Sequence, residues 1–145
     1  MRQLIRDHIN RHPDLRQQRE LLTTIPGIGD TTAATLIAEL FDKPYLNARQ
    51  AAAFAGLVPR IQQSGLWRGR SRLSKIGPSR LRKALFFPAL AALRCNPTIR
   101  ANTASLRAAG RPKMVIVGAA MRRLIHIAFG VLKTGRAYDP QLVRP

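Results

Sequence analysis

Acidic residues are almost missing from most of this 145-residue chain. Asp and Glu number seven against 25 Lys and Arg, and residues 43 to 138 contain no acid at all. The same stretch holds 19 Lys and Arg, so its surface repels itself unless an anion neutralises it. The abundant polyanions of a cell are nucleic acids. The charge distribution therefore predicts a nucleic-acid partner.

Cysteine occurs once, as Cys95, which excludes an internal disulfide and a paired-cysteine metal motif. Long uninterrupted apolar runs are also lacking, because Arg122 and Arg123 break the apolar stretch in residues 114–132. The N-terminus has no apolar signal-peptide segment. Hydrophobic residues make up 46% of the chain, too many for a disordered basic tail. We therefore expect one folding unit in the cytoplasm, associated with the nucleoid and not with a membrane.

The apolar spacing and the turn residues predict a mainly α-helical, compact domain. A helical lead-in divided by Pro13, a tight turn at residues 25–29 and a basic glycine-rich loop at residues 57–77 accompany the helices. That loop has no helical period, so we expect it to be extended or hairpin-like. Helices are expected at residues 31–40, 48–55, 78–94, 97–109 and 112–132, with a loose tail at residues 136–145. Phe86, Phe87 and Phe129 are core candidates, and Cys95 is expected to be buried.

The turn that contains Gly27 and Gly29 has two readings. Glycines let backbone N–H groups approach a phosphate, and the following helix would direct its positive end to the same place. This arrangement resembles the helix-hairpin-helix motif, which binds the backbone of duplex DNA. Alternatively, the glycines only permit a tight turn between two helices and Asp30 caps the second one.

The basic loop combines cations, serines and the single tryptophan, a composition suited to phosphate binding and to stacking on a base. Its candidate binding residues are Arg60, Trp67, Arg68, Arg70, Arg72 and Lys75, extended by Arg80, Arg82 and Lys83 on the next helix. Trp67 could equally cover the core. A serine among arginines could attack phosphorus, although composition alone favours a serine that only forms hydrogen bonds.

Several spaced motifs resemble the C-terminal domain of the insertion sequence 110 family of transposases. They are Gly56-x-x-Pro59, Ser64-Gly65, Gly69, Ser74-Lys75-x-Gly77, Leu81-Arg82 and Gly110-x-x-Lys113. The resemblance divides the chain into the end of a helical linker arm (residues 1–20), the transposase domain (21–135) and a tail (136–145). Within the domain it implies a helix-hairpin-helix at about 21–41, the serine loop at 57–77 and a helical core at 78–135.

The same resemblance implies DNA transposition and recombination through a serine nucleophile, here Ser64, with Ser74 as second choice. It also implies a structured guide RNA and homo-oligomers on DNA as partners. Family members hold Mg²⁺ with four acidic residues of an RNase-H-like N-terminal domain that this sequence lacks. We therefore expect no metal site or other cofactor in this chain, and no catalysis by the isolated chain.

A non-catalytic function is the alternative. Some small ribosomal proteins combine a Gly-x-Gly helical hairpin with strong basicity, so the chain could be a structural RNA-binding protein. Both readings predict steep salt dependence of binding, because each neutralised phosphate releases counterions.

Overall fold

A computed structural model describes residues 2–57, 59–60, 63–64, 67–68, 72–73 and 79–141. Most of these residues are helical, which confirms the predicted fold class. The helices are α1 (Arg2–Arg11), α2 (Pro13–Thr23), α3 (Asp30–Glu39), α4 (Ala48–Phe54), α5 (Ser79–Cys95), α6 (Pro97–Ala108) and α7 (Lys113–Thr134). Between α4 and α5 lie four two-residue strands, β1 (Pro59–Arg60), β2 (Gln63–Ser64), β3 (Trp67–Arg68) and β4 (Arg72–Leu73).

Residues with strong capping preferences set three helix ends. The Asn47 side chain accepts a hydrogen bond from the Gln50 amide at the start of α4. Asn96 does the same for the Ile99 amide at the start of α6. Helix α7 ends at Gly135, which adopts the left-handed conformation with φ of +68°.

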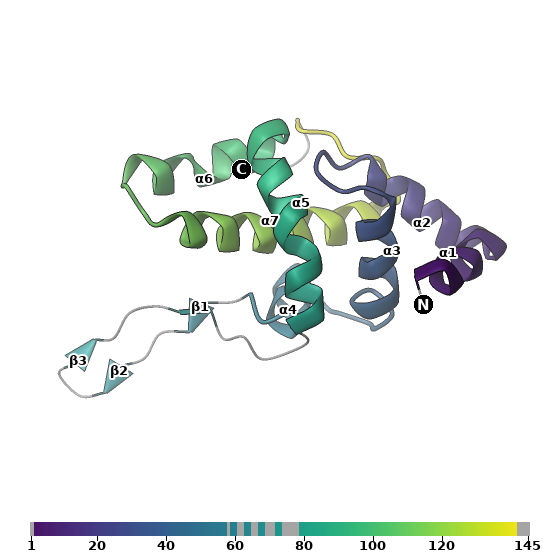
Figure 1. Cartoon of the computed structure of the whole chain (residues 1–145), viewed down its shortest axis with the longest axis horizontal. Helices are drawn as coiled ribbons and strands as arrows, with labels where there is room; N and C mark the ends of the chain where they lie inside the picture. The colour runs from purple at the N-terminus through teal and green to yellow at the C-terminus, as the bar shows by residue number, and fades with distance from the viewer. Residues whose placement is uncertain are drawn as a thin grey trace.

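Helix α7 is the centre of the core. It packs against α2, α4, α5 and α6, and α5 crosses in front of it in Figure 1. Its buried side chains include Leu124, Ile125 and Ala128. By length and composition alone α7 could also cross a membrane, but 56% of its apolar window is buried inside this domain. Packing of a core helix therefore accounts for its apolar character.

Helices α1 and α2 pack against α3 at the end of the molecule opposite to β2 and β3 (Figure 1). Ile9 of α1 and Leu22 of α2 are fully or almost fully buried. The N-terminal residues that were expected to form a lead-in thus contribute to the packed structure. They bring three of the seven acids, Asp7, Asp14 and Glu20, to this end.

Gly27 lies where the α2–α3 turn meets α5. Its φ is +106°, a conformation that side chains disfavour. A Cβ at this position would lie 2.9 Å from the Ala92 Cβ and 3.0 Å from the Pro88 carbonyl oxygen. Gly29, two residues later, has open space around the corresponding position and a φ of −96°. The first glycine is therefore required by packing, and the second is not.

Asn96 ties three distant segments together. Its side-chain amide donates to the Pro26 carbonyl over 3.1 Å, and its Oδ1 accepts from the Tyr138 hydroxyl over 3.0 Å. The Tyr138 amide in turn donates to Thr24 Oγ1 over 2.9 Å. The expectation of a loose tail from residue 136 onward is thus wrong at Tyr138, because this residue closes a hydrogen-bonded network over the α2–α3 turn.

Two predicted core residues are at the surface. Phe87 is 75% exposed, whereas its neighbour Phe86 is half-buried and packs against the core. Adjacent helical residues point about 100° apart, so one apolar stripe accommodates only one of the two rings. Cys95, at the last position of α5, is exposed as well. Phe129 is half-buried, with the Lys133 ammonium 5.9 Å from its ring centroid.

Replacing Gly27 with alanine should lower the free energy of unfolding by about 2–4 kcal/mol, because it adds both backbone strain and a clash with α5. Gly29→Ala is the matched control, and we expect it to cost less than about 1 kcal/mol. Urea unfolding of both variants measures the difference. Equal losses would contradict the assigned packing role of Gly27.

Asn96→Ala should destabilise the domain by about 2–4 kcal/mol, since it removes a helix cap and leaves the Pro26 carbonyl without its partner. The control is Asn47→Ala, which removes an exposed cap of the same type and should cost about 1 kcal/mol. Thermal and urea unfolding of the two variants compare them directly. A loss for Asn96→Ala no larger than for Asn47→Ala would show that the network adds nothing beyond the cap.

Candidate nucleic-acid interface

The four strands form two antiparallel ladders between α4 and α5. In the inner ladder, β1 pairs with β4, with Pro59 opposite Leu73 and Arg60 opposite Arg72. In the outer ladder, β2 pairs with β3, with Gln63 opposite Arg68 and Ser64 opposite Trp67. The outer ladder lies farther from the helices than β1 does (Figure 1). The backbone of the candidate nucleophile Ser64 is therefore far from the helical core.

This register brings several predicted binding positions together. Arg60 and Arg72 are opposed in the inner ladder, while Trp67 and Arg68 follow one another in the outer one. For these residues and Ser64 the structure describes the backbone positions. The predicted residues Arg70, Ser74 and Lys75 lie outside the described residues.

The first turn of α5 carries three more predicted cations, which differ in their surroundings. Arg80 forms an ion pair with Glu39 of α3, with Nη1 and Oε1 3.2 Å apart. Arg82 is half-buried, and its guanidinium donates to the Ala55 carbonyl at the end of α4 over 3.3 Å. Arg82 therefore helps to join α4 to α5. Lys83 is exposed to solvent.

A second group of basic residues gathers where α4 packs on α7. It consists of Arg49 from α4 and of Arg122, Arg123 and His126 from α7. Burial lowers the pKa of His126, and the positive charges of Arg122, Arg123 and Arg49 lower it further. Burial also lowers the pKa of Arg123. His126 is therefore more weakly basic than an exposed histidine, and its neutral form is favoured in this positive environment.

Two nitrogen atoms of this group are buried without a hydrogen-bond partner in the described part of the chain, Arg123 Nε and His126 Nε2. The binding residues predicted from the sequence do not include this group. Two adjacent arginines, Arg122 and Arg123, inside an otherwise apolar helix are the sequence feature that could have indicated it. Cations that remain close together without acids between them increase the positive potential of this face.

At the α2–α3 turn the two glycines have different surroundings. Gly27 is packed against α5, which supports a role in the turn. Gly29 is exposed and precedes the first residue of α3, where free backbone N–H groups point outward. Asp30 was the expected cap, but it lies inside the first turn, and Gly29 occupies the cap position. The Asp30 carboxylate opposes an anion at this site.

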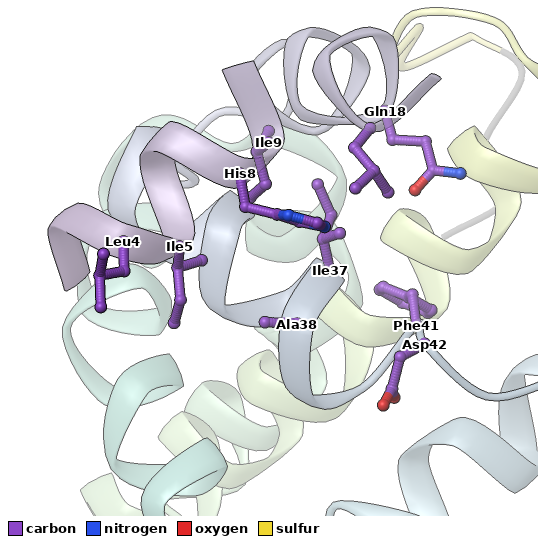
Figure 2. Close-up of a pocket in the computed structure, with 10 residues that line it drawn as sticks. Leu4, Ile5, His8, Ile9, Gln18, Ile37, Ala38, Phe41 and Asp42 are labelled. Carbon is purple, nitrogen blue, oxygen red and sulfur yellow. The ribbon is translucent and has the colours of Figure 1, made fainter. Parts of the chain in front are cut away.

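An apolar groove of about 450 Å³ opens between α1, α2 and α3. Figure 2 shows its lining, in which Leu4, Ile5 and Ile9 of α1 face Ile37 and Ala38 of α3. Its polar side chains are His8, Gln18 and Asp42. Apolar side chains make up most of this lining.

Potential metal ligands are scattered over the described ranges. Among those residues, no three His, Cys, Asp or Glu side chains come together in a way that could hold a metal ion.

Known proteins resemble this chain along most of its length. The pilin gene-inverting protein of Moraxella bovis is 34% identical over 137 residues, which are 92% of this chain and 42% of that protein. The probable family 20 transposase of Pseudomonas aeruginosa is 32% identical over 131 residues, 88% of this chain and 38% of that protein. A transposase for insertion sequence element IS1328 of Yersinia enterocolitica is 47% identical over 68 residues, 44% of this chain and 20% of that protein.

The chain thus spans about two fifths of the length of the relatives that it matches over most of its own length. A family model for transposases matches residues 19–104, which include the α2–α3 turn, all four strands and α5. On this match and these identities, the chain belongs to the transposase IS116/IS110/IS902 family.

Proposed function

We propose that this chain is the DNA-binding and strand-transfer part of a transposase. Family membership carries the proposal, and the acid-free stretch of residues 43–138 supports it independently. The names of two relatives specify a gene inversion and a transposase, and both point to DNA as the substrate. A stretch with 19 Lys and Arg and no acid of its own suits such a polyanionic substrate.

The two ladders are the proposed contact with the DNA backbone. Their register opposes Arg60 to Arg72, and like charges at opposed positions destabilise a ladder in water. A phosphate group bound nearby would neutralise that repulsion. We therefore assign the strands, together with Lys83 on α5, to phosphate contacts that position the DNA without reading its sequence.

Ser64 is the proposed nucleophile. In the reaction, its Oγ would form a bond to a backbone phosphorus as the bond from that phosphorus to one sugar oxygen breaks. The serine proton leaves, and the released sugar oxygen gains a proton, so a serine–DNA ester and a free hydroxyl result. Cations around the phosphate would stabilise the charge that develops on its oxygens.

The reaction requires more than this chain. We assign Mg²⁺ to an acidic domain of the full-length transposase, as the family resemblance implies. A structured guide RNA and other copies of the protein on DNA are part of the same proposal, as is a location on the nucleoid in the cytoplasm. The ribosomal alternative has no support in the family match.

The salt dependence of DNA binding tests the backbone contact. Arg68→Gln with Arg70→Gln should reduce the slope of log affinity against log salt by about 2, because each lost phosphate contact contributes about 0.9. Arg11→Gln with Arg16→Gln removes the same charge from α1 and α2 and should leave the slope almost unchanged. Fluorescence anisotropy with a labelled duplex measures both pairs. Equal effects of the two pairs on the slope would mean that only the net charge of the protein attracts DNA. That result would contradict a DNA interface at the strands.

A covalent adduct tests the nucleophile. In a full-length family protein that contains this domain and the metal-binding domain, incubation with element DNA should yield a protein–DNA adduct that survives denaturation. Ser64→Ala should abolish the adduct. Ser74→Ala should retain it, because Ser74 is only the second choice of nucleophile. Adducts that persist in Ser64→Ala and vanish in Ser74→Ala would transfer the role to Ser74.

A further inference from the structure

One face of α5 carries an exposed aromatic ring between cations. Arg80, Lys83, Phe87, Ala91 and Arg94 follow one another at intervals of three or four residues, so they share one side of the helix, and all five are exposed. Among the exposed large hydrophobic side chains of the described residues, Phe87 is the aromatic one. The face begins where α5 leaves the strands, and α5 then crosses the front of the molecule in Figure 1.

The ring of Phe87 is supported from the core side. Phe86 packs against the core, and its ring centroid lies 5.4 Å from that of Phe87 with an interplanar angle of 80°. Edge-to-face pairs of this kind are favourable and hold the two rings relative to each other. One turn further along the face stands Ala91, a small and exposed residue. The ring is thus held in position and is 75% exposed.

The cations around the ring define what it can bind. Lys83 lies one turn before Phe87, a rise of about 6 Å, and Arg94 lies two turns after it, a rise of about 10 Å. No acidic residue occurs between residues 43 and 138, so α5 itself contributes no negative side chain to this face. Glu39 of α3 pairs with Arg80 at the start of the face, before Lys83 and Arg94 in the sequence of the helix. A neutral apolar partner would gain nothing from these charges. A ligand with an aromatic surface between negatively charged groups would use the ring and the cations together.

We propose that Phe87 is a stacking platform for an unpaired base of single-stranded nucleic acid, with Lys83 and Arg94 binding the phosphates on either side. The inference rests on the proposed function and specifies its substrate, because bases inside a duplex have both faces covered by their neighbours and cannot stack on a side chain. Strand transfer needs strands that have been opened, and this face of α5 would hold such a strand next to the ladders.

The test uses a single-stranded oligonucleotide that contains 2-aminopurine, together with the duplex of the same sequence. The intact chain should bind the single strand and quench the 2-aminopurine fluorescence through stacking. Phe87→Ala should weaken single-strand binding by about fivefold or more and remove the quenching, whereas duplex binding should change by less than about twofold. Phe87→Trp should restore both affinity and quenching.

Two control variants separate stacking from a general loss of apolar surface. Phe87→Leu keeps an apolar side chain without an aromatic face, so it should behave like Phe87→Ala. Leu4→Ala removes an equally exposed side chain, 73% exposed on α1, and should bind the single strand as the unchanged protein does. Circular dichroism and thermal unfolding establish that all variants are folded, which is expected because both positions are exposed.

Several results would overturn the proposal. Undiminished single-strand binding by Phe87→Ala would exclude the platform, as would full activity of Phe87→Leu in the quenching assay. A change of oligomeric state in Phe87→Ala, measured by light scattering with unchanged binding, would assign the ring to a contact between protein copies. If the unchanged protein binds neither the single strand nor the duplex, the proposed function itself fails, and this outcome is distinguishable from selective loss in the variant.

Discussion

The packing of the helices in this domain depends on the hydrogen bonds of one buried side chain, that of Asn96. Its carboxamide is fully buried, and it joins the start of α6, the α2–α3 turn and Tyr138 by hydrogen bonds of 3.0 to 3.2 Å. A buried amide is costly unless each of its polar atoms is paired, so these partners are held in one geometry. The turn is thereby fixed against α5, where Gly27 allows the two backbones to approach.

Acidic and basic residues are concentrated in different parts of the molecule. The helices at the N-terminal end contain most of the acids and the apolar groove, whereas the strands, α5 and the α4–α7 contact contain cations alone among their charged residues. Self-repulsion of the second part is a cost that the helical core must offset. At His126 burial is the main cause of the lowered pKa, and the charges of Arg122, Arg123 and Arg49 lower it further, so the repulsion acts there as a secondary effect.

Local signals allowed the helices to be predicted. Asn47 marks a helix start and Gly135 a helix end because each acts within its own turn of backbone. Phe87 and Cys95 were assigned to the core because hydrophobicity does not show which side of a helix has room, and neither residue is buried. The hydrogen bond from Tyr138 to Thr24 joins residues that are 114 positions apart in the sequence, so no local sequence pattern indicates it. The identity of the α2–α3 unit as a helix-hairpin-helix stays a prediction, as do the site assignments in the basic loop.

The position of Tyr138 has a consequence for how the protein is made. Its contacts with Thr24 and Asn96 join the segment after α7 to the α2–α3 turn and to the start of α6, so the turn acquires its full set of partners only after residue 138 has been synthesised. Until that residue leaves the ribosome, the α2–α3 turn lacks its C-terminal anchor while the cationic segments have already emerged. The complete domain is therefore a late product of translation, finished only after its basic surface has been exposed to the nucleic acids of the cell.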